Sequence, residues 1–207
     1  MKSFVRVGLM LAMAAFMLIN SGCGYNSIQA KEEQVFAKWA DVEAAYQRRA
    51  DLIPSLVEVV KGYAAHEKET FTQVAQARAS VGQIKLDPKG LQDAAQMAKF
   101  QAQQQTIGSA LSRLMMVTEK YPDLKANESF MNLQSQLEGT ENRINTERVR
   151  YNKVVAEFNT MIRTFPNSIT NSLLLNLEKK TPFKSDEGAK IAPKVSFSGA
   201  APSNNKP

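Results

Sequence analysis

The sequence predicts an all-α protein, an elongated antiparallel four-helix bundle whose first two helices are either separate or one helix kinked at Pro54. Two observations support this. Ala, Gln, Glu, Lys, Leu and Met, which favour helices, dominate the middle of the 207-residue chain, where glycine and proline are scarce. Apolar residues recur there at intervals of three and four, whereas alternating β-branched runs bounded by turn residues are nearly absent.

The first two predicted helices cover about residues 27–50 and 56–81. Their apolar stripes are Ile28, Val35, Trp39, Val42 and Tyr46 in the first, and Leu56, Val60, Tyr63, Phe71, Val74 and Val81 in the second. Pro54 lies between them. Proline costs about 3 kcal/mol inside a helix but is favoured in a first turn, so a kinked continuous helix and a short break both fit.

Two further helices are predicted at about residues 91–120 and 125–164. The last has the most regular stripe, consisting of Phe130, Leu133, Leu137, Thr140, Ile144, Arg148, Tyr151, Val155, Phe158 and Ile162. Proline-containing turns at residues 87–90, 121–123 and 165–167 separate or end these helices. From residue 178 the chain is rich in Lys, Ser, Asn and Pro without an apolar face. The sequence therefore predicts a bundle over residues 28–177 and a disordered tail over 178–207.

The formal charge of +6 suggests nucleic-acid binding, but the distribution of the charges argues against it. Residues 24–177 hold 18 basic and 17 acidic residues, because much of the excess lies in the leader and the tail. A body this close to neutral implies no basic face that could follow phosphates, so we expect no nucleic-acid partner.

The first 22 residues are predicted to be a signal peptide. A basic start with Lys2 and Arg6 precedes an apolar run over residues 7–19, then small residues and Cys23, the only cysteine. The run is shorter than the ~20 apolar residues that a spanning helix needs. Ser21-Gly22-Cys23 resembles the end of a bacterial lipobox, so we predict that Cys23 carries the lipid and that residues 23–27 form the anchor region.

One residue departs from the lipobox pattern, because Asn20 stands where leucine is usual. The alternative is an uncleaved anchor with Cys23 at the membrane edge. Either form places the body outside the cytoplasm, on the cell membrane or the outer membrane, and in the periplasm if the cell has two membranes. Gly24 after the cysteine resembles the outer-membrane sorting class.

A search of the sequence for catalytic motifs gives little. His66-Glu67 begins like the zinc-protease motif HExxH, but Thr70 occupies the place of the second histidine and the chain has no other. The single histidine lies on a predicted helix without a nucleophile turn, and no glycine-rich phosphate loop is present. We therefore expect no catalytic residue, metal or cofactor.

Several charged residues interrupt the apolar stripes. They are Arg49, Asp51, Glu67, Glu141 and Arg148. Charges at core positions are costly unless they are paired. One hypothesis is an interhelical polar layer that joins Glu67 or Glu141 to Arg148 or Arg49 and fixes the register of the helices. The alternative is a wide stripe from which these long side chains reach water.

Several blocks of sequence, in a constant order, carry a resemblance to a known family. They are residues 24–26, 47–57, 60–67, 110–114, 119–127, 139–144, 150–152 and 165–166, and the longest begins Gln47-Arg48-Arg49-Ala50-Asp51-Leu52-Ile53-Pro54. Together they resemble the LemA family over about residues 24–167. The resemblance implies a membrane-attached, elongated helical bundle outside the cytoplasmic membrane, without established catalytic activity. Relatives often have a non-lipidated membrane helix, so Cys23 suggests the lipoprotein form.

These observations favour a non-enzymatic envelope protein that acts as an interaction or scaffold module for an envelope protein partner. Homo-oligomerisation through the long helix, as in a coiled coil, is compatible with that function. The alternative is an accessory subunit of a membrane protease or of an envelope quality-control system, for which the His66-Glu67 pair is the only motivation in the sequence.

Overall fold

The computed structural model describes residues 2–81 and 86–184, with side chains for residues 24–80 and 86–184. These residues form helices and no strand, which confirms the predicted all-α class. In chain order the elements are α1 (Lys2–Tyr63), α2 (Lys68–Val81), α3 (Ala94–Thr118), α4 (Pro122–Lys125), α5 (Glu128–Met161), α6 (Asn167–Thr170) and the π-helical turn η1 (Asn171–Leu175). The signal peptide over residues 1–22 and the lipid on Cys23 stay predictions, because they depend on residues whose side chains lie outside the described part.

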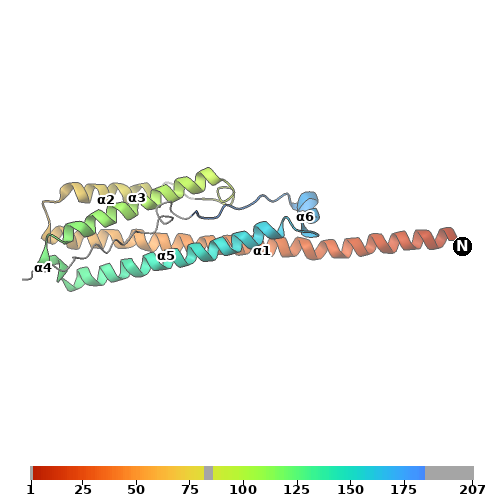
Figure 1. Cartoon of the computed structure of the whole chain (residues 1–207), viewed down its shortest axis with the longest axis horizontal. Helices are drawn as coiled ribbons and strands as arrows, with labels where there is room; N and C mark the ends of the chain where they lie inside the picture. Colours follow the sequence, from red (N-terminus) through yellow and green to blue (C-terminus); the bar gives the residue numbers. More distant parts are fainter. Residues whose placement is uncertain (1, 82–85, 185–207) are drawn as a thin grey trace, which may run out of the picture.

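The four longer helices are α1, α2, α3 and α5, and each runs antiparallel to the one before it (Figure 1). The short α4 forms the corner before α5. α5 lies along α1, and the hairpin of α2 and α3 covers that pair on one side (Figure 1). The N-terminal part of α1 projects beyond all other elements as a single rod (Figure 1). Across the described part of the chain, no helix combines the length and the apolar character needed to cross a membrane.

Of the two alternatives at Pro54, the structure has the continuous helix, because α1 runs through Pro54 to Tyr63. Proline lacks the N–H that would bond to the carbonyl of Ala50, four residues earlier. Arg78 of α2 supplies the missing donor, since its Nε lies 3.3 Å from the Ala50 oxygen. α1 ends at Tyr63, and residues 64–67 divide the helix that was predicted over 56–81. Tyr63 is 43% exposed where a buried position was predicted.

The buried apolar residues form two separate clusters along the bundle. The proximal core, on the side of the projecting rod, consists of Ile28, Val35, Trp39, Val42, Ala45, Tyr46, Leu86, Leu91, Met97, Phe100, Ile144, Tyr151, Val155, Phe158, Ile162 and Phe183. The distal core consists of Ile53, Leu56, Val60, Ala64, Phe71, Val74, Ala77, Ile107, Ala110, Leu111, Leu114, Val117, Leu124, Phe130 and Leu137. The predicted stripes of α1 and α5 supply residues to both cores.

The prediction of a disordered tail from residue 178 is wrong for residues 178–184. The chain runs back from η1 toward the start of α3 (Figure 1), and Lys180 and Phe183 are only 2% and 5% exposed. We call residues 177–184 the strap. Composition misled the prediction, because a strap without an apolar period can still bury single side chains. The rest of the predicted tail, residues 185–207, lies outside the described residues.

Candidate functional site

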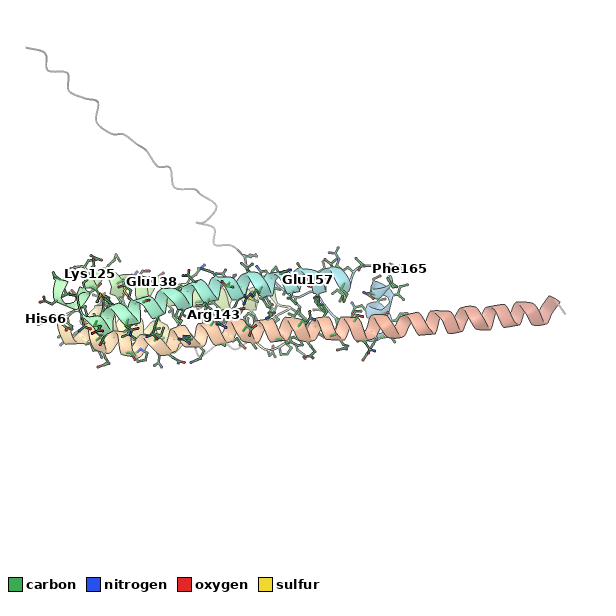
Figure 2. The ribbon with its side chains drawn as sticks, turned by 90° about the horizontal axis from the view of Figure 1, so that it is seen from below. His66, Lys125, Glu138, Arg143, Glu157 and Phe165 are labelled. Carbon is green, nitrogen blue, oxygen red and sulfur yellow. The ribbon has the colours of Figure 1, made fainter. Side chains whose placement is uncertain are left out.

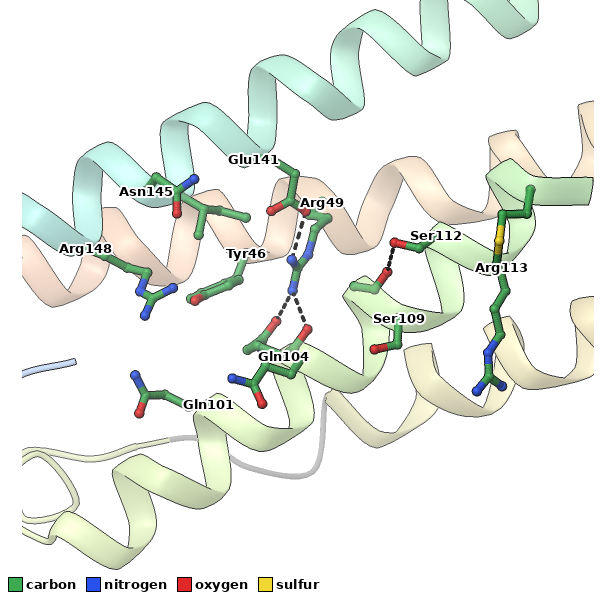
Figure 3. A pocket seen from close by; sticks show the side chains of 14 residues that line it. Tyr46, Arg49, Gln101, Gln104, Ser109, Ser112, Arg113, Glu141, Asn145 and Arg148 are labelled. Carbon is green, nitrogen blue, oxygen red and sulfur yellow. Dashed lines mark hydrogen bonds and ion pairs between the residues drawn. The ribbon is translucent and has the colours of Figure 1, made fainter. Parts of the chain in front are cut away.

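Arg49 lies between the two cores. Its Nη1 donates to Glu141 Oε1 at 2.8 Å, and its Nη2 donates to Gln104 Oε1 at 2.6 Å and to the Gln104 carbonyl oxygen at 3.2 Å (Figure 3). On α1, Tyr46 belongs to the proximal core and Ile53 to the distal core. The polar layer formed by Arg49, Gln104 and Glu141 therefore falls where the apolar packing is interrupted.

The two charges of the layer differ in exposure. The side chain of Arg49 is 5% exposed and that of Glu141 is 42% exposed, so the carboxylate stays partly hydrated. A buried guanidinium requires partners for its donors, and Gln104 supplies two acceptors from one residue. The layer therefore ties α1 to both α3 and α5 at a single level of the bundle.

The remaining residues proposed for a polar layer lie elsewhere. Asp51 is exposed and accepts a hydrogen bond from Gln47 Nε2 at 2.7 Å. Glu67 lies in the connection between α1 and α2, 3.8 Å from the Nζ of Lys120. Arg148 is half-buried, and its Nη2 donates to the carbonyl oxygen of Lys184 in the strap at 3.1 Å. Of the five, only Arg49 and Glu141 contact each other through an ion pair among the described residues.

His66 is exposed in the turn between α1 and α2, at the end of the bundle opposite Phe165 (Figure 2). In residues 24–80 and 86–184, no three or more His, Cys, Asp or Glu side chains are placed to hold a metal ion. The His66-Glu67 pair therefore belongs to no such metal-holding group in the described part of the chain.

The polar layer opens into a groove of about 740 Å³ between α3 and α5. Tyr46 and Arg49 of α1 contribute to its floor, and amide, hydroxyl and guanidinium groups dominate its walls (Figure 3). The wall residues include Gln101, Gln105, Ser109, Ser112, Arg113, Asn145 and Arg148. Such a lining suits a ligand with many hydrogen-bonding groups along its length, as an extended peptide has.

The strap reaches one end of this groove. Gln101 Nε2 and Arg148 Nη2, which line the groove, both donate to the Lys184 carbonyl oxygen, at 3.3 and 3.1 Å. An extended segment leaves its backbone N–H and C=O groups without internal partners, and burying them unpaired is costly. The partners of the strap backbone therefore show how this face of the bundle holds a peptide.

Asparagine side chains supply most of those partners. Asn159 pairs with both backbone groups of Lys180, with both distances 2.8 Å, and Asn152 pairs with those of Phe183 at 3.0 and 2.8 Å. Seven helical residues advance about 10.5 Å, and three residues of a polyproline-II chain about 9 Å, so the two periods nearly match. Asn145, one heptad before Asn152 on α5, lines the groove beyond the strap.

Two side chains anchor the strap to the proximal core. Lys180 Nζ donates to Glu32 Oε1 at 2.6 Å, and this ion pair is nearly fully buried, with 1% and 11% of the two side chains exposed. Phe183 stacks on Trp39 at 5.8 Å between ring centres and packs edge-on against Tyr151. Burial raises the pKa of the Tyr151 hydroxyl, which donates to the Thr181 carbonyl oxygen at 3.2 Å.

Sequence reasoning missed Gln104, Glu32, Lys180, Asn152 and Asn159. Gln104, Glu32 and Lys180 gave no usable signal, because their partners lie far away in the sequence. The asparagines did give one, since Asn145, Asn152 and Asn159 repeat every seven residues on one helix. Amides repeated at heptad spacing place three donor–acceptor pairs in line along a helix face.

Comparison with known proteins identifies the family. The LemA family model matches residues 38–197. The magnetosome protein MamQ of Magnetospirillum gryphiswaldense is 27% identical over 180 residues, 77% of this chain and 66% of its own length. The protein LemA of Metamycoplasma hominis is 24% identical over 164 residues, 79% of this chain and 70% of its own.

A further magnetosome protein, MamQ 2 of Paramagnetospirillum magneticum, is 28% identical over 158 residues, covering 69% of this chain and 58% of that protein. The chain thus spans less than two thirds of the length of its magnetosome relatives. The family match includes α2, α3, α5 and the strap as well as most of the α1 portion within the bundle. The chain therefore belongs to the LemA family.

Proposed function

We propose that this protein is a membrane-anchored, non-enzymatic interaction module of the cell envelope, whose groove binds an extended peptide segment of a partner protein. The observation that supports it most is the strap. This face of the bundle already holds an extended chain through its backbone, and the groove continues past Lys184 with side chains of the same chemistry.

The groove also favours a class of peptide. Arg49, Arg113 and Arg148 line it against a single acid, Glu141. Arg148 and Arg113 each have further N–H donors beyond the one they give to Lys184 and Gln73. Backbone pairing with Asn145 would supply affinity without regard to side chains, and the guanidinium groups would favour a peptide that carries acidic residues.

Site-specific photo-crosslinking in intact cells tests the groove. A photoreactive residue at Asn145 should give discrete adducts with a partner. The matched control is Thr146, its exposed neighbour, which does not line the groove. Equal adducts from both positions, or none from Asn145, would contradict the proposal. A chain that ends at Lys184 completes the design. Adducts that map to residues 185–207 in the full-length protein and are lost from the shortened chain would mean that the groove is filled in cis.

The anchor requires its own test. Intact-mass analysis of the protein extracted from membranes should show the loss of residues 1–22 and the addition of acyl chains at Cys23. An unmodified mass with the leader retained would replace the lipid anchor by an uncleaved one. Light scattering on the extracted protein determines whether the anchored form is a monomer or a homo-oligomer.

A further inference from the structure

The end of the bundle that lies beside the projecting rod carries an unusual set of exposed apolar side chains. Phe165 is 80% exposed, Ile169 51%, Leu173 76% and Leu174 64%. We call these four residues the end patch. Other large exposed apolar side chains of the described residues, such as Met116 and Val149, lie singly on long helices and need no explanation, whereas four within ten residues indicate a contact surface.

The end patch is held against α1 at a defined level. α6 and η1 both pack on α1, and Gly24 of α1 is buried beneath α6. A Cβ added at Gly24 would lie 3.0 Å from both Asn167 Oδ1 and Thr170 Oγ1, so the glycine permits this close approach. The patch therefore sits where α1 leaves the bundle and continues as the projecting rod (Figures 1 and 2).

Both anchors that the sequence allows place lipid at this level. If the leader is cleaved, the acyl chains are on Cys23, the residue next to Gly24. If it is retained, the apolar run ends at Ile19, five residues before Gly24, which is about 7.5 Å along a helix. In either case the headgroup region of the bilayer meets the end of the bundle that carries α6 and η1.

The chemistry of the segment suits such an interface. Between residues 163 and 177 the only charged residue is Arg163, which is exposed, so no acid opposes anionic headgroups. Tyr25, 41% exposed, and Phe165 provide aromatic rings at the same end, and rings of this kind favour the membrane–water interface. A second copy of the chain would cover the patch equally well, but it would not account for the position beside the anchor.

We propose that α6 and η1 dock on the bilayer surface and insert the end patch into the headgroup region, which fixes the tilt of the bundle relative to the membrane. This inference rests on the proposed membrane anchor. Docking would hold the groove at a constant height above the lipid, because one continuous segment runs from α6 through η1 and the strap to the end of the groove.

Lipid quenching of tryptophan fluorescence tests the inference on the full-length protein. The protein is reconstituted in vesicles of phosphatidylcholine and phosphatidylglycerol, with or without bromine on the acyl chains. The native Trp39 is buried in the proximal core and provides the baseline. Phe165→Trp and, as a second reporter, Leu173→Trp should each lose at least half of their added emission in brominated vesicles. The control Val149→Trp, exposed on the middle of α5, should lose none.

Flotation of the same vesicles separates the two proposals. If the protein floats with the vesicles but neither reporter at the end patch is quenched, the anchor holds and docking is wrong. If the protein does not float, the anchor fails and the docking inference fails with it. Quenching at Val149 equal to that at Phe165 would indicate general adsorption, and oligomers that protect Phe165 from lipid would assign the patch to a second copy. Either result would overturn the proposal.

Discussion

In the distal core the fourth wall of the bundle is a helix, α2, whereas in the proximal core it is the strap. α2 has 14 residues and α5 has 34, so at 1.5 Å per residue they span about 21 and 51 Å. Accordingly Phe71, Val74 and Ala77 of α2 occur only in the distal core, and Phe183 of the strap only in the proximal core. The strap covers the part of the bundle that α2 is too short to reach.

The two walls differ in how their backbones are satisfied. A helix pairs its own N–H and C=O groups, so α2 contributes mainly apolar side chains. An extended strap must borrow partners, and Asn152 and Asn159 supply them. A wall of this second kind depends on polar side chains of the bundle, so we expect it to open without unfolding the helices beneath it. The strap face is therefore the part of the bundle best suited to exchange one extended segment for another.

The largest expected effect comes from matched deletions in the two cores. Phe130 and Phe183 are 1% and 5% exposed. Phe130→Ala should lower the free energy of unfolding by about 3–5 kcal/mol, because the cavity lies among helices that cannot collapse locally. Phe183→Ala should cost about 1–2 kcal/mol in global unfolding, since the strap can detach alone. Denaturant unfolding of the full chain in detergent measures both, and equal losses would contradict the local opening.

The polar layer at the boundary between the cores comes next. Arg49→Ala should cost about 3 kcal/mol, because it leaves a cavity and the Gln104 side chain unpaired. Arg49→Met keeps most of the volume and should cost less, and Arg49→Met combined with Gln104→Leu should be close to neutral. The same unfolding experiment provides the values. If the double variant were as unstable as Arg49→Ala, the layer would be essential to the fold, which argues against a role limited to register.

The regions also differ in how well the sequence predicts them. Apolar stripes on α1 and α5 are local signals with a helical period, so these helices and many of their core residues followed from the sequence. The sequence could not decide between a break and a continuous helix at Pro54, because the donor to the Ala50 carbonyl comes from Arg78, 28 positions away in sequence. The strap could not be predicted from the sequence either, since the buried Lys180 pairs with Glu32, which lies 148 positions away. Neither contact produces a periodic pattern in the sequence.

The buried ion pair of the strap should show strong coupling. Lys180→Met leaves the Glu32 carboxylate without its partner and should cost about 2 kcal/mol, whereas adding Glu32→Leu should recover most of that loss. A double-mutant cycle on the full chain measures the coupling, with hydrogen exchange of residues 177–184 as the local readout. Additive losses would mean that the pair is hydrated in solution and does not hold the strap.

The asparagine pairing predicts a smaller and more local change. Asn159→Asp removes the donor to the Lys180 carbonyl oxygen and brings a charge against it. The Lys180 N–H keeps its acceptor, because a carboxylate oxygen replaces Asn159 Oδ1. Amide exchange at Thr181, whose peptide group contains that carbonyl, should therefore accelerate about tenfold, which corresponds to one lost hydrogen bond of about 1.4 kcal/mol. Asn145→Asp is the matched control, because Asn145 lies one heptad beyond the Asn152 pair and makes no hydrogen bond to the strap within the described residues. Acceleration by both substitutions would assign the effect to charge alone.

The smallest expected effect concerns the helix that both regions share. Arg78→Met removes the donor to the Ala50 carbonyl and should cost about 0.5–1 kcal/mol, since Arg78 is exposed and water can replace part of the bond. Pro54→Ala supplies a backbone N–H for the same carbonyl and should make Arg78→Met nearly neutral. Denaturant unfolding of the four combinations measures this dependence. A cost for Arg78→Met that persists with Pro54→Ala would show that Arg78 acts through its packing on α1, and the passage of the helix through Pro54 would then need another source of stability.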